Sequence, residues 1–229
     1  MHVPDGFLDA PTSVATGVVA AAAVAVSLRA ARRELDERTA PMAGLVATFV
    51  FAAQMINFPV GAGTSGHLMG GALAAVLVGP WTAVLCLAVV LLVQALLMAD
   101  GGITALGTNI TLIGIVTVVV GWAVFVVLRR VLPRRLDLVA PAAAVGALVS
   151  VPVAALVFTG LFAVGDNAPV DLAAVAIAMF GWHTVIGVGE AVVTGLVVAS
   201  VVAARPDLVH GARPLIAQRE LVTRKVVVR

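Results

Sequence analysis

Charged residues are scarce in this sequence. Asp, Glu, Lys and Arg make up 11% of the 229 residues, whereas apolar residues make up 62%. Soluble domains carry about 25% charged residues, and several apolar runs here reach the roughly 20 residues that span a bilayer as a helix. The scarcity of charge excludes a soluble domain and predicts an all-α, polytopic membrane protein. We expect a multi-pass protein of the bacterial inner or plasma membrane.

Other features are missing too. The only cysteine, Cys86, lies inside an apolar run, so an intrachain disulfide is excluded and the thiol is expected to pack. No G-x-x-x-x-G-K-[ST] or dinucleotide-binding pattern occurs, and no segment is large enough for a soluble nucleotide-binding domain. The chain is therefore not expected to be an enzyme, and another protein or a gradient must supply energy. The positions of the basic residues do not suggest a nucleic-acid partner.

Basic residues are confined to three segments, and the loops between these segments carry acids only, such as Asp5, Asp100 and Asp166. By the positive-inside rule the three basic segments are cytoplasmic. The basic residues are Arg29, Arg32, Arg33 and Arg38, then Arg129, Arg130, Arg134 and Arg135, and finally Arg205, Arg213, Arg219, Arg224, Lys225 and Arg229.

About seven membrane segments fit between these loops, with the N-terminus outside and the C-terminus cytoplasmic. They are residues 12–28, 43–56, a short glycine-rich segment 67–78 followed by a turn at Gly79-Pro80, and then 81–98, 109–128, 138–164 and 172–204. The last segment is too long for one span, so we expect a short interfacial helix before a spanning helix from His183. Residues 1–204 then form one membrane domain, and residues 205–229 form a basic cytoplasmic tail.

The N-terminus suggests a metal site. Acids precede the first apolar run and arginines follow it, which is the reverse of a cleaved signal peptide. The bulky His2 disfavours removal of Met1, so a free amine is expected there. This amine, the amide nitrogen of His2 and the His2 imidazole can close adjoining chelate rings around one metal ion. His67, predicted on the same outer side, can supply a fourth nitrogen. Nitrogen-rich planar sites suit Ni(II) or Cu(II), and imidazole also suits cobalt and zinc.

Several blocks of sequence resemble a known family. They are Met1-His2-Val3-Pro4-Asp5-Gly6-Phe7-Leu8, the stretch from Phe58 to Leu68, Gly79-Pro80, the stretch from Gln94 through Asp100 to Asn109, and His183 to Glu190. The order of these blocks across roughly residues 1–200 is similar to that in the substrate-binding membrane subunits of energy-coupling-factor transporters for cobalt and nickel.

The resemblance implies a function and a ligand set. Family members hold the metal with the N-terminal amine, the amide and imidazole of the second residue, and a histidine after the second helix, which here are Met1, His2 and His67. Such a subunit captures Ni(II) or Co(II) for an ATP-driven importer, the latter for cobalamin biosynthesis, and needs no resident cofactor. The implied partners are a transmembrane coupling subunit and two ATPase subunits, with a small accessory membrane subunit left open.

Other polar residues are candidates for supporting roles. Hydroxyl and amide groups near the predicted ligands can orient imidazoles, although helix or loop capping explains them equally well. These residues are Asn57, Thr64, Ser65 and Asn109. Asp5 can pin the N-terminal segment or attract cations, but we favour a solvated turn residue. Gln94 and Asp100 are expected in polar contacts and not as ligands.

His183 and Glu190 lie seven residues apart, two helical turns, and therefore share a helix face. Ionisable groups inside a membrane helix are functional by default. They can relay the ion or lock the last helix against its neighbours. We favour the structural role, because neither is needed to complete four nitrogens.

Gly17, Ala21 and Ala25 form a small-residue stripe on the first predicted span. Such stripes allow close helix packing, either against the coupling subunit or within this chain.

Two rival functions remain. Gly63-Thr64-Ser65-Gly66 matches the G-x-S-G pattern of rhomboid-type intramembrane proteases, in which Ser65 and His183 would form a dyad. Four residues are a weak motif in a glycine-rich chain. A purely structural membrane subunit is the other alternative. Mutation separates the hypotheses: a protease depends on Ser65, a metal-capturing protein on His67, and a structural subunit on neither. The sequence does not choose between nickel and cobalt.

Overall fold

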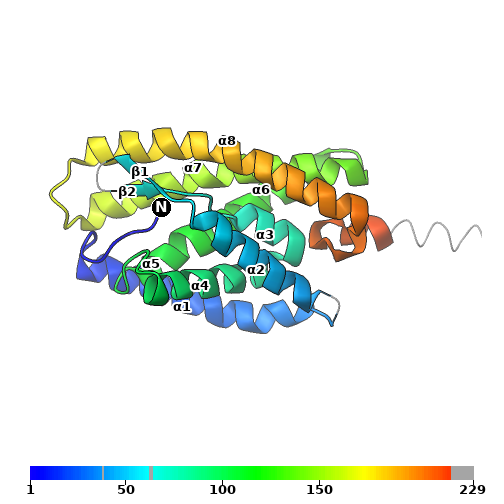
Figure 1. Ribbon diagram of the computed structural model, residues 1–229, viewed down its shortest axis with the longest axis horizontal. Helices are drawn as coiled ribbons and strands as arrows, with labels where there is room; N and C mark the ends of the chain where they lie inside the picture. Colours follow the sequence, from blue (N-terminus) through cyan, green and yellow to red (C-terminus); the bar gives the residue numbers. More distant parts are fainter. Residues whose placement is uncertain (38, 62–63, 218–229) are drawn as a thin grey trace, which may run out of the picture.

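The fold is an elongated bundle of helices running mostly along its long axis (Figure 1). The computed structural model describes residues 1–37, 39–61 and 64–217, apart from the side chain of Thr64. The main helices are α1 (Ala10–Ala30), α2 (Ala40–Gln54), α3 (Gly71–Val78), α4 (Pro80–Leu97), α5 (Leu106–Asn109), α6 (Thr117–Val131), α7 (Val139–Gly165) and α8 (Leu172–Ala204).

Helix starts and breaks follow local sequence signals. The Asp9 carboxylate accepts a hydrogen bond from the Thr12 amide and so caps α1, and Asp171 caps α8 in the same way through Ala174. Between α3 and α4, Gly79 adopts a φ of 97°, and Pro80 is the first residue of α4. The predicted turn at Gly79-Pro80 is therefore confirmed.

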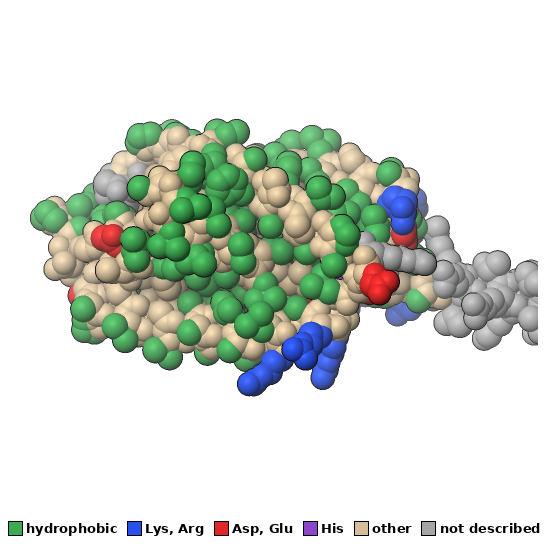
Figure 2. Space-filling model, turned by 60° about the horizontal axis from the view of Figure 1, so that its bottom comes forward, with side chains coloured by type: hydrophobic (Ala, Val, Ile, Leu, Met, Phe, Trp, Pro, Cys, Tyr) green, Lys and Arg blue, Asp and Glu red, His purple; other side chains and the backbone are tan. Residues whose placement is uncertain are grey.

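The chain is a multi-pass membrane protein. In the part of the chain that the structure describes, helices over residues 10–33, 80–97, 106–131, 136–165 and 172–204 are long and apolar enough to cross a membrane, and α2 is a shorter apolar helix. Hydrophobic side chains cover the middle of the face in Figure 2, with arginines gathered toward one end. The predicted orientation depends on this distribution of charge and stays a prediction, as does the count of seven segments.

The expected break in the last segment is wrong. Helix α8 runs without interruption from Leu172 to Ala204, 33 residues, and packs along α7. No proline interrupts its backbone hydrogen bonds, and its buried residues recur every three or four positions. At 1.5 Å per residue, α8 is about 50 Å long and exceeds the roughly 30 Å hydrocarbon core, so it must tilt or project. His183 lies within this helix and does not begin it.

The predicted segment 109–128 is part of a longer helix with an unpredicted widened turn. Residues Ile110–Val116 form a π-helix between α5 and α6. Such turns are often found at functional sites. The buried side chain of Asn109 lies directly before it.

Helix α3 is the centre of the bundle. All eight of its residues are buried, and it contacts α2, α4, α6 and α7. One hydrophobic cluster surrounds α3, and a second lies at the end of the bundle that holds the N-terminal residues. The short 67–78 segment expected from the sequence is thus a buried helix preceded by an irregular stretch.

The polar stretch after α2 forms a hairpin that the sequence analysis did not anticipate. Strand β1 (Phe58–Gly61) pairs antiparallel with β2 (Thr64–Gly66), with Phe58 opposite Gly66 and a bulge between Pro59 and Gly61. The hairpin leads directly into His67.

The described part of the tail packs onto the bundle. Val209, Ala212 and Leu215 join the hydrophobic cluster around α3, and Arg213 donates a hydrogen bond to the carbonyl of Glu34. Residues 218–229, the rest of the predicted basic tail, lie outside the described residues.

Candidate metal-binding site

The N-terminal segment, residues 1–9, is buried at residues 1–3, 7 and 8 and exposed at residues 4–6. Met1 and Val3 are each only 1% exposed and His2 is 7% exposed. Phe7 stacks on Phe158, with ring centroids 5.9 Å apart. Burial of this apolar surface holds the segment in place and brings the α-amine of Met1 inside the protein.

Asn109 and Asp5 fasten this segment. The Asn109 side chain accepts from the Val3 amide at 2.7 Å and donates to the Val3 carbonyl at 3.1 Å. The Asp5 carboxylate accepts hydrogen bonds from the amide and hydroxyl of Thr104. These bonds also hold the pKa of Asp5 below its usual range. Both residues therefore hold the backbone beside His2, and a role for them in metal binding stays a prediction.

The His67 ring is oriented by its own loop. Its Nδ1 lies 2.8 Å from the Leu68 carbonyl, and its Nε2 is buried with no hydrogen-bond partner among the described residues. A carbonyl at Nδ1 requires the proton there, which leaves the Nε2 lone pair bare. Metal-ligating histidines are held in this way.

Glu190 fixes the backbone after His67. Its carboxylate accepts hydrogen bonds from the amides of Met69 at 2.7 Å and Gly70 at 2.9 Å. Gln54 donates to the Met69 carbonyl at 2.8 Å, and Gln94 donates to Gln54 at 3.0 Å. Glu190 thus ties α8 to the start of α3, which agrees with the structural role favoured for it. The sequence analysis gave no role to Gln54.

His2 and His67, 65 positions apart in the sequence, meet in space. Their rings stack with centroids 4.3 Å apart and an interplanar angle of 24°. Nδ1 of His2 is 3.0 Å from Oδ1 of Asp100, and neither ring nitrogen of His2 has a hydrogen-bond partner of good geometry in the described chain.

Burial favours the unprotonated, metal-binding forms of two donors. Desolvation lowers the pKa of the Met1 amine from 8.0 to about 4, although Asp100 and Glu190 act in the opposite direction. Desolvation also lowers the pKa of His67 well below its usual value, and the nearby amine and His2 add to this effect. The contact with His2 lowers the pKa of the Asp100 carboxyl. At neutral pH the amine and the His67 imidazole are therefore neutral, as ligands must be.

A cavity of about 440 Å³ lies beside His2. His2, Asn57, Ser65 and Asp100 are among the residues that line it. Asn57 donates to Asp100 at 3.4 Å. Asn57 and Ser65 therefore lie on the approach to His2, and the role considered for the Thr64 side chain falls outside the described residues.

His183 is the third buried imidazole at this end. Its Nδ1 lies 2.8 Å from the Met179 carbonyl and its Nε2 has no partner among the described residues, as in His67. It also lies within electrostatic range of the Met1 amine. In the part of the chain that the structure describes, no group of three or more His, Cys, Asp and Glu side chains is arranged to hold a metal.

The residues of the small-residue stripe on α1 have different environments. The backbone of Gly17 lies directly against Gly107, so this position packs within the chain. Ala21 and Ala25 are exposed, and a partner contact there stays a prediction.

Comparison with solved structures defines the class of protein. The fold matches the crystal structure of a truncated transition metal transporter with a TM-score of 0.82 and 29% sequence identity, over 89% of this chain and 99% of that one. A second transition metal transporter structure matches with a TM-score of 0.81 and 30% identity, over 89% of this chain and 93% of the other. The protein is therefore a helical membrane protein of the transition-metal-transport class.

The family follows from sequence. The model of the CbiM family, described as the cobalt uptake substrate-specific transmembrane region, matches residues 2–208, and the chain belongs to this family. A putative metal transport protein of Haloquadratum walsbyi is 38% identical over 209 residues, 91% of this chain and 93% of that protein. The fused nickel transport protein NikMN of Rhodobacter capsulatus is 36% identical over 234 residues, 96% of this chain and 67% of that protein. The cobalt transport protein CbiM of Sorangium cellulosum is 41% identical over 133 residues, 57% of this chain and 59% of that protein. The resemblance noted in the sequence is thereby confirmed.

Proposed function

We propose that this chain is the metal-capturing membrane component of an ATP-driven importer for Ni(II) or Co(II). The observation that carries the proposal is the burial of the Met1 amine beside the stacked rings of His2 and His67. The bare Nε2 of His67 supports it. Membership of a cobalt-uptake family and similarity to nickel transport proteins give the class of cargo.

Capture proceeds by ligand exchange and requires a free amine on Met1. The ion exchanges its water shell for the Met1 amine, the His2 amide nitrogen, the His2 imidazole and Nε2 of His67. Met1 and His2 close two adjoining chelate rings through shared backbone atoms, the second through Nδ1 of His2, which gives up its 3.0 Å contact with Asp100. His67 fills the remaining position of the plane. The amide must lose its proton, so binding releases at least one proton to the surroundings.

Release into the cell requires other proteins. We propose a transmembrane coupling subunit and two ATPase subunits as partners, with room for a small accessory membrane subunit. The fused NikMN protein of Rhodobacter capsulatus supports a larger assembly, because this chain covers only 67% of its length. The chain alone is not expected to hydrolyse ATP.

Metal affinity of the purified protein with an unmodified N-terminus tests the proposal. Nickel, cobalt, copper and zinc are each offered to the wild type and to His2→Ala, His67→Ala, His183→Ala and Ser65→Ala variants. We expect one ion per chain, an affinity loss of at least about a hundredfold in the first two variants, and nearly wild-type affinity in the last two. The preferred metal identifies the cargo.

Other results of this experiment would contradict the proposed ligand set. Metal retained in both His2→Ala and His67→Ala would exclude this ligand set. A loss in His183→Ala as large as that in His67→Ala would make His183 a ligand. The protease hypothesis requires a Ser65–His183 dyad, yet among the described residues these two side chains share no hydrogen bond, and Nδ1 of His183 contacts the Met179 carbonyl. We therefore do not propose proteolysis.

A further inference from the structure

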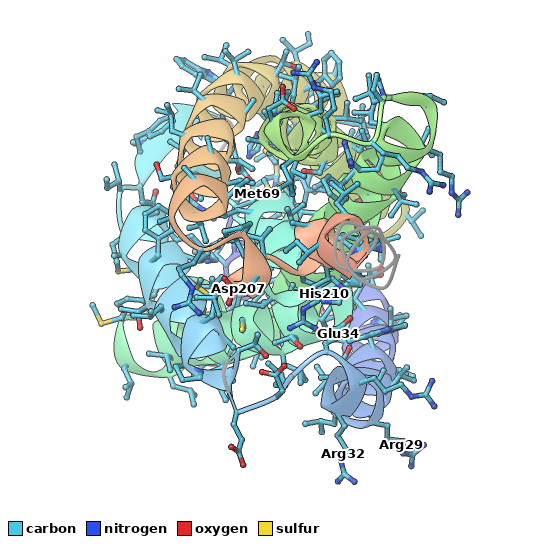
Figure 3. The ribbon with its side chains drawn as sticks, turned by 90° about the vertical axis from the view of Figure 1, so that its right-hand side faces the viewer. Arg29, Arg32, Glu34, Met69, Asp207 and His210 are labelled. Atoms are coloured by element: carbon cyan, nitrogen blue, oxygen red, sulfur yellow. The ribbon has the colours of Figure 1, made fainter. Side chains whose placement is uncertain are left out.

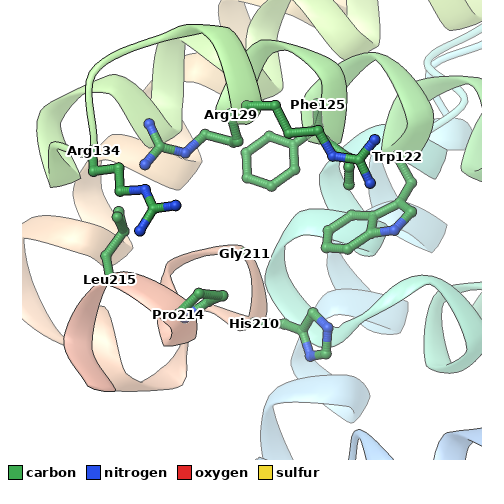
Figure 4. A pocket seen from close by; sticks show the side chains of 10 residues that line it. Trp122, Phe125, Arg129, Arg134, His210, Gly211, Pro214 and Leu215 are labelled. Atoms are coloured by element: carbon green, nitrogen blue, oxygen red, sulfur yellow. The ribbon is translucent and has the colours of Figure 1, made fainter. Parts of the chain in front are cut away.

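A second cavity lies at the opposite end of the bundle, where the arginines gather. It has a volume of about 340 Å³, within the range of small-ligand sites. The C-terminal part of α6 and the loop after it form one side, and the segment from His210 to Leu215 forms the other (Figure 4). Figure 3 views the bundle from this end.

The cavity is strongly basic. Arg129, Arg130 and Arg134 line it, together with His210, and no acid is among the described residues that do so. Asp137 pairs with Arg135 at 2.6 Å and also attracts Arg129, while Glu34 attracts His210. Three arginines line the cavity against these two nearby acids.

Two nitrogen atoms in this cavity lack partners. Nη1 of Arg129 and Nδ1 of His210 are shielded from solvent, and neither has a hydrogen-bond partner among the described residues. A guanidinium can only donate, and its planar arrangement of N–H groups matches the oxygens of carboxylate or phosphate. The missing partner of Arg129 is thus an acceptor, and an anion fits the surrounding charge best.

The walls of the cavity are apolar. Trp122 stacks on Phe125 with centroids 5.3 Å apart, and Val126 and Leu215 complete the lining beside the arginines. On the surface of the same helix, Val127 is 56% exposed and Val131 is 73% exposed, so an apolar strip adjoins the basic end. A site that joins guanidinium groups to apolar surface at the end of a membrane helix matches a phosphate attached to hydrocarbon chains. Basic pockets between membrane helices bind anionic headgroups in this way.

We propose that this cavity binds the phosphate of an anionic phospholipid. The phosphate oxygens accept from Arg129 and Arg134, and the hydrocarbon chains leave along α6. The inference does not depend on the metal site.

Native mass spectrometry of the delipidated full-length protein in detergent tests the proposal. The probes are phosphatidylglycerol and phosphatidylcholine with identical acyl chains, and inorganic phosphate. We expect one phosphatidylglycerol per chain, bound about tenfold more tightly than phosphatidylcholine and not displaced by millimolar inorganic phosphate. Binding should weaken in Arg134→Gln and more in Arg129→Gln/Arg134→Gln.

The matched control is Arg29→Gln/Arg32→Gln. These two exposed arginines project away from the bundle at the same end (Figure 3), so this variant removes equal charge away from the cavity. It should keep the lipid. If both double variants lost phosphatidylglycerol equally, the lipid would be held only by the general positive charge of this end. If inorganic phosphate displaced the lipid, the cavity would be a site for a free anion. Either result, or no preference between the two lipids, overturns the proposal. Because Arg134 is exposed, its single variant should still fold, and an unchanged unfolding midpoint checks this.

Discussion

At the scale of single residues, hydrogen bonding decides which nitrogen is available as a ligand. His67 and His183 are both buried, and in both the backbone carbonyl at Nδ1 leaves Nε2 bare. Only His67 stacks directly on His2. A sequence gives the residue type but not the carbonyl beside each ring, so the tautomer and the stacking could not be predicted.

The pH dependence of metal affinity should be unusually shallow for an amine ligand. The pKa of the Met1 amine is about 4 and that of His67 is also lowered, so between pH 8 and 7 protons do not compete for these donors. Release of the His2 amide proton should make affinity fall about tenfold over this pH unit. Competition titrations with nickel at several pH values measure the slope.

A peptide of residues 1–9 is the control. Its exposed amine keeps a pKa near 8.0, so its affinity should fall several-fold more over the same pH unit. Equal slopes for protein and peptide would contradict the burial of the amine.

At the scale of elements, buried carboxylates join one helix to the start of another. Glu190 of α8 accepts the amides that precede α3, and Glu34, after α1, accepts the amides of Trp81 and Thr82 in the first turn of α4. The first amides of a helix have no partner within it and carry positive partial charge. These two acids are thereby stabilised in an otherwise apolar interior.

Loss of the Glu34 charge should destabilise the fold. Glu34 is 6% exposed, and its carboxylate also accepts from the Thr82 hydroxyl at 2.9 Å. In Glu34→Gln an amide group replaces one acceptor oxygen and turns a donor toward other donors. We expect a loss of about 2 kcal/mol in the free energy of unfolding, seen as a lower thermal midpoint in detergent.

Glu37→Gln is the matched control for this prediction. Glu37 lies in the same loop but is exposed, so its substitution should leave the midpoint unchanged. Similar midpoints for the two variants would mean that the cap on α4 contributes little.

The sequence predicted most elements because their signals are local. Apolar length gives the long helices, and Gly79-Pro80 marks the turn before α4. It failed where an outcome depends on distant contacts. The continuity of α8 through His183 depends on a buried face packed against α7, and the hairpin before His67 has only a weak pattern. The π-helix after Asn109 likewise has no sequence signature.

For the site, the sequence proposed His2 and His67, and the structure shows that their rings lie close together. The contact of Asp100 with His2 and the bond from Gln54 to Met69 come from tertiary structure alone.

At the scale of the whole molecule, apolar residues of the N-terminal segment complete the core. Met1, Val3, Phe7 and Leu8 belong to the same hydrophobic cluster as Met69 and Phe158. Residues 1–9 therefore connect to the loop after α4 through Asp5 and to the end of α7, where the Asp9 amide donates to the Gly165 carbonyl at 2.7 Å. The candidate ligands are brought together by the folding of the entire bundle.

An N-terminal extension should abolish metal binding while leaving the fold largely intact. Adding Gly-Ser before Met1 converts the amine into an amide and forces new atoms into a region where Met1 is only 1% exposed. We expect nickel affinity to fall by at least about a hundredfold, since one donor and its chelate ring are lost. The Val3–Asn109 and Asp5–Thr104 hydrogen bonds lie further along the segment, so the thermal midpoint should drop only modestly.

The same dipeptide added after Arg229 is the control and should leave affinity unchanged. Isothermal titration with nickel and a thermal scan on all three proteins separate loss of the site from loss of the fold. If the N-terminally extended protein bound nickel as tightly as the wild type, the Met1 amine could not be a ligand. His2 and His67 would then have to hold the ion without it, and Nε2 of His183, bare and within electrostatic range of the amine, would be the next donor to test.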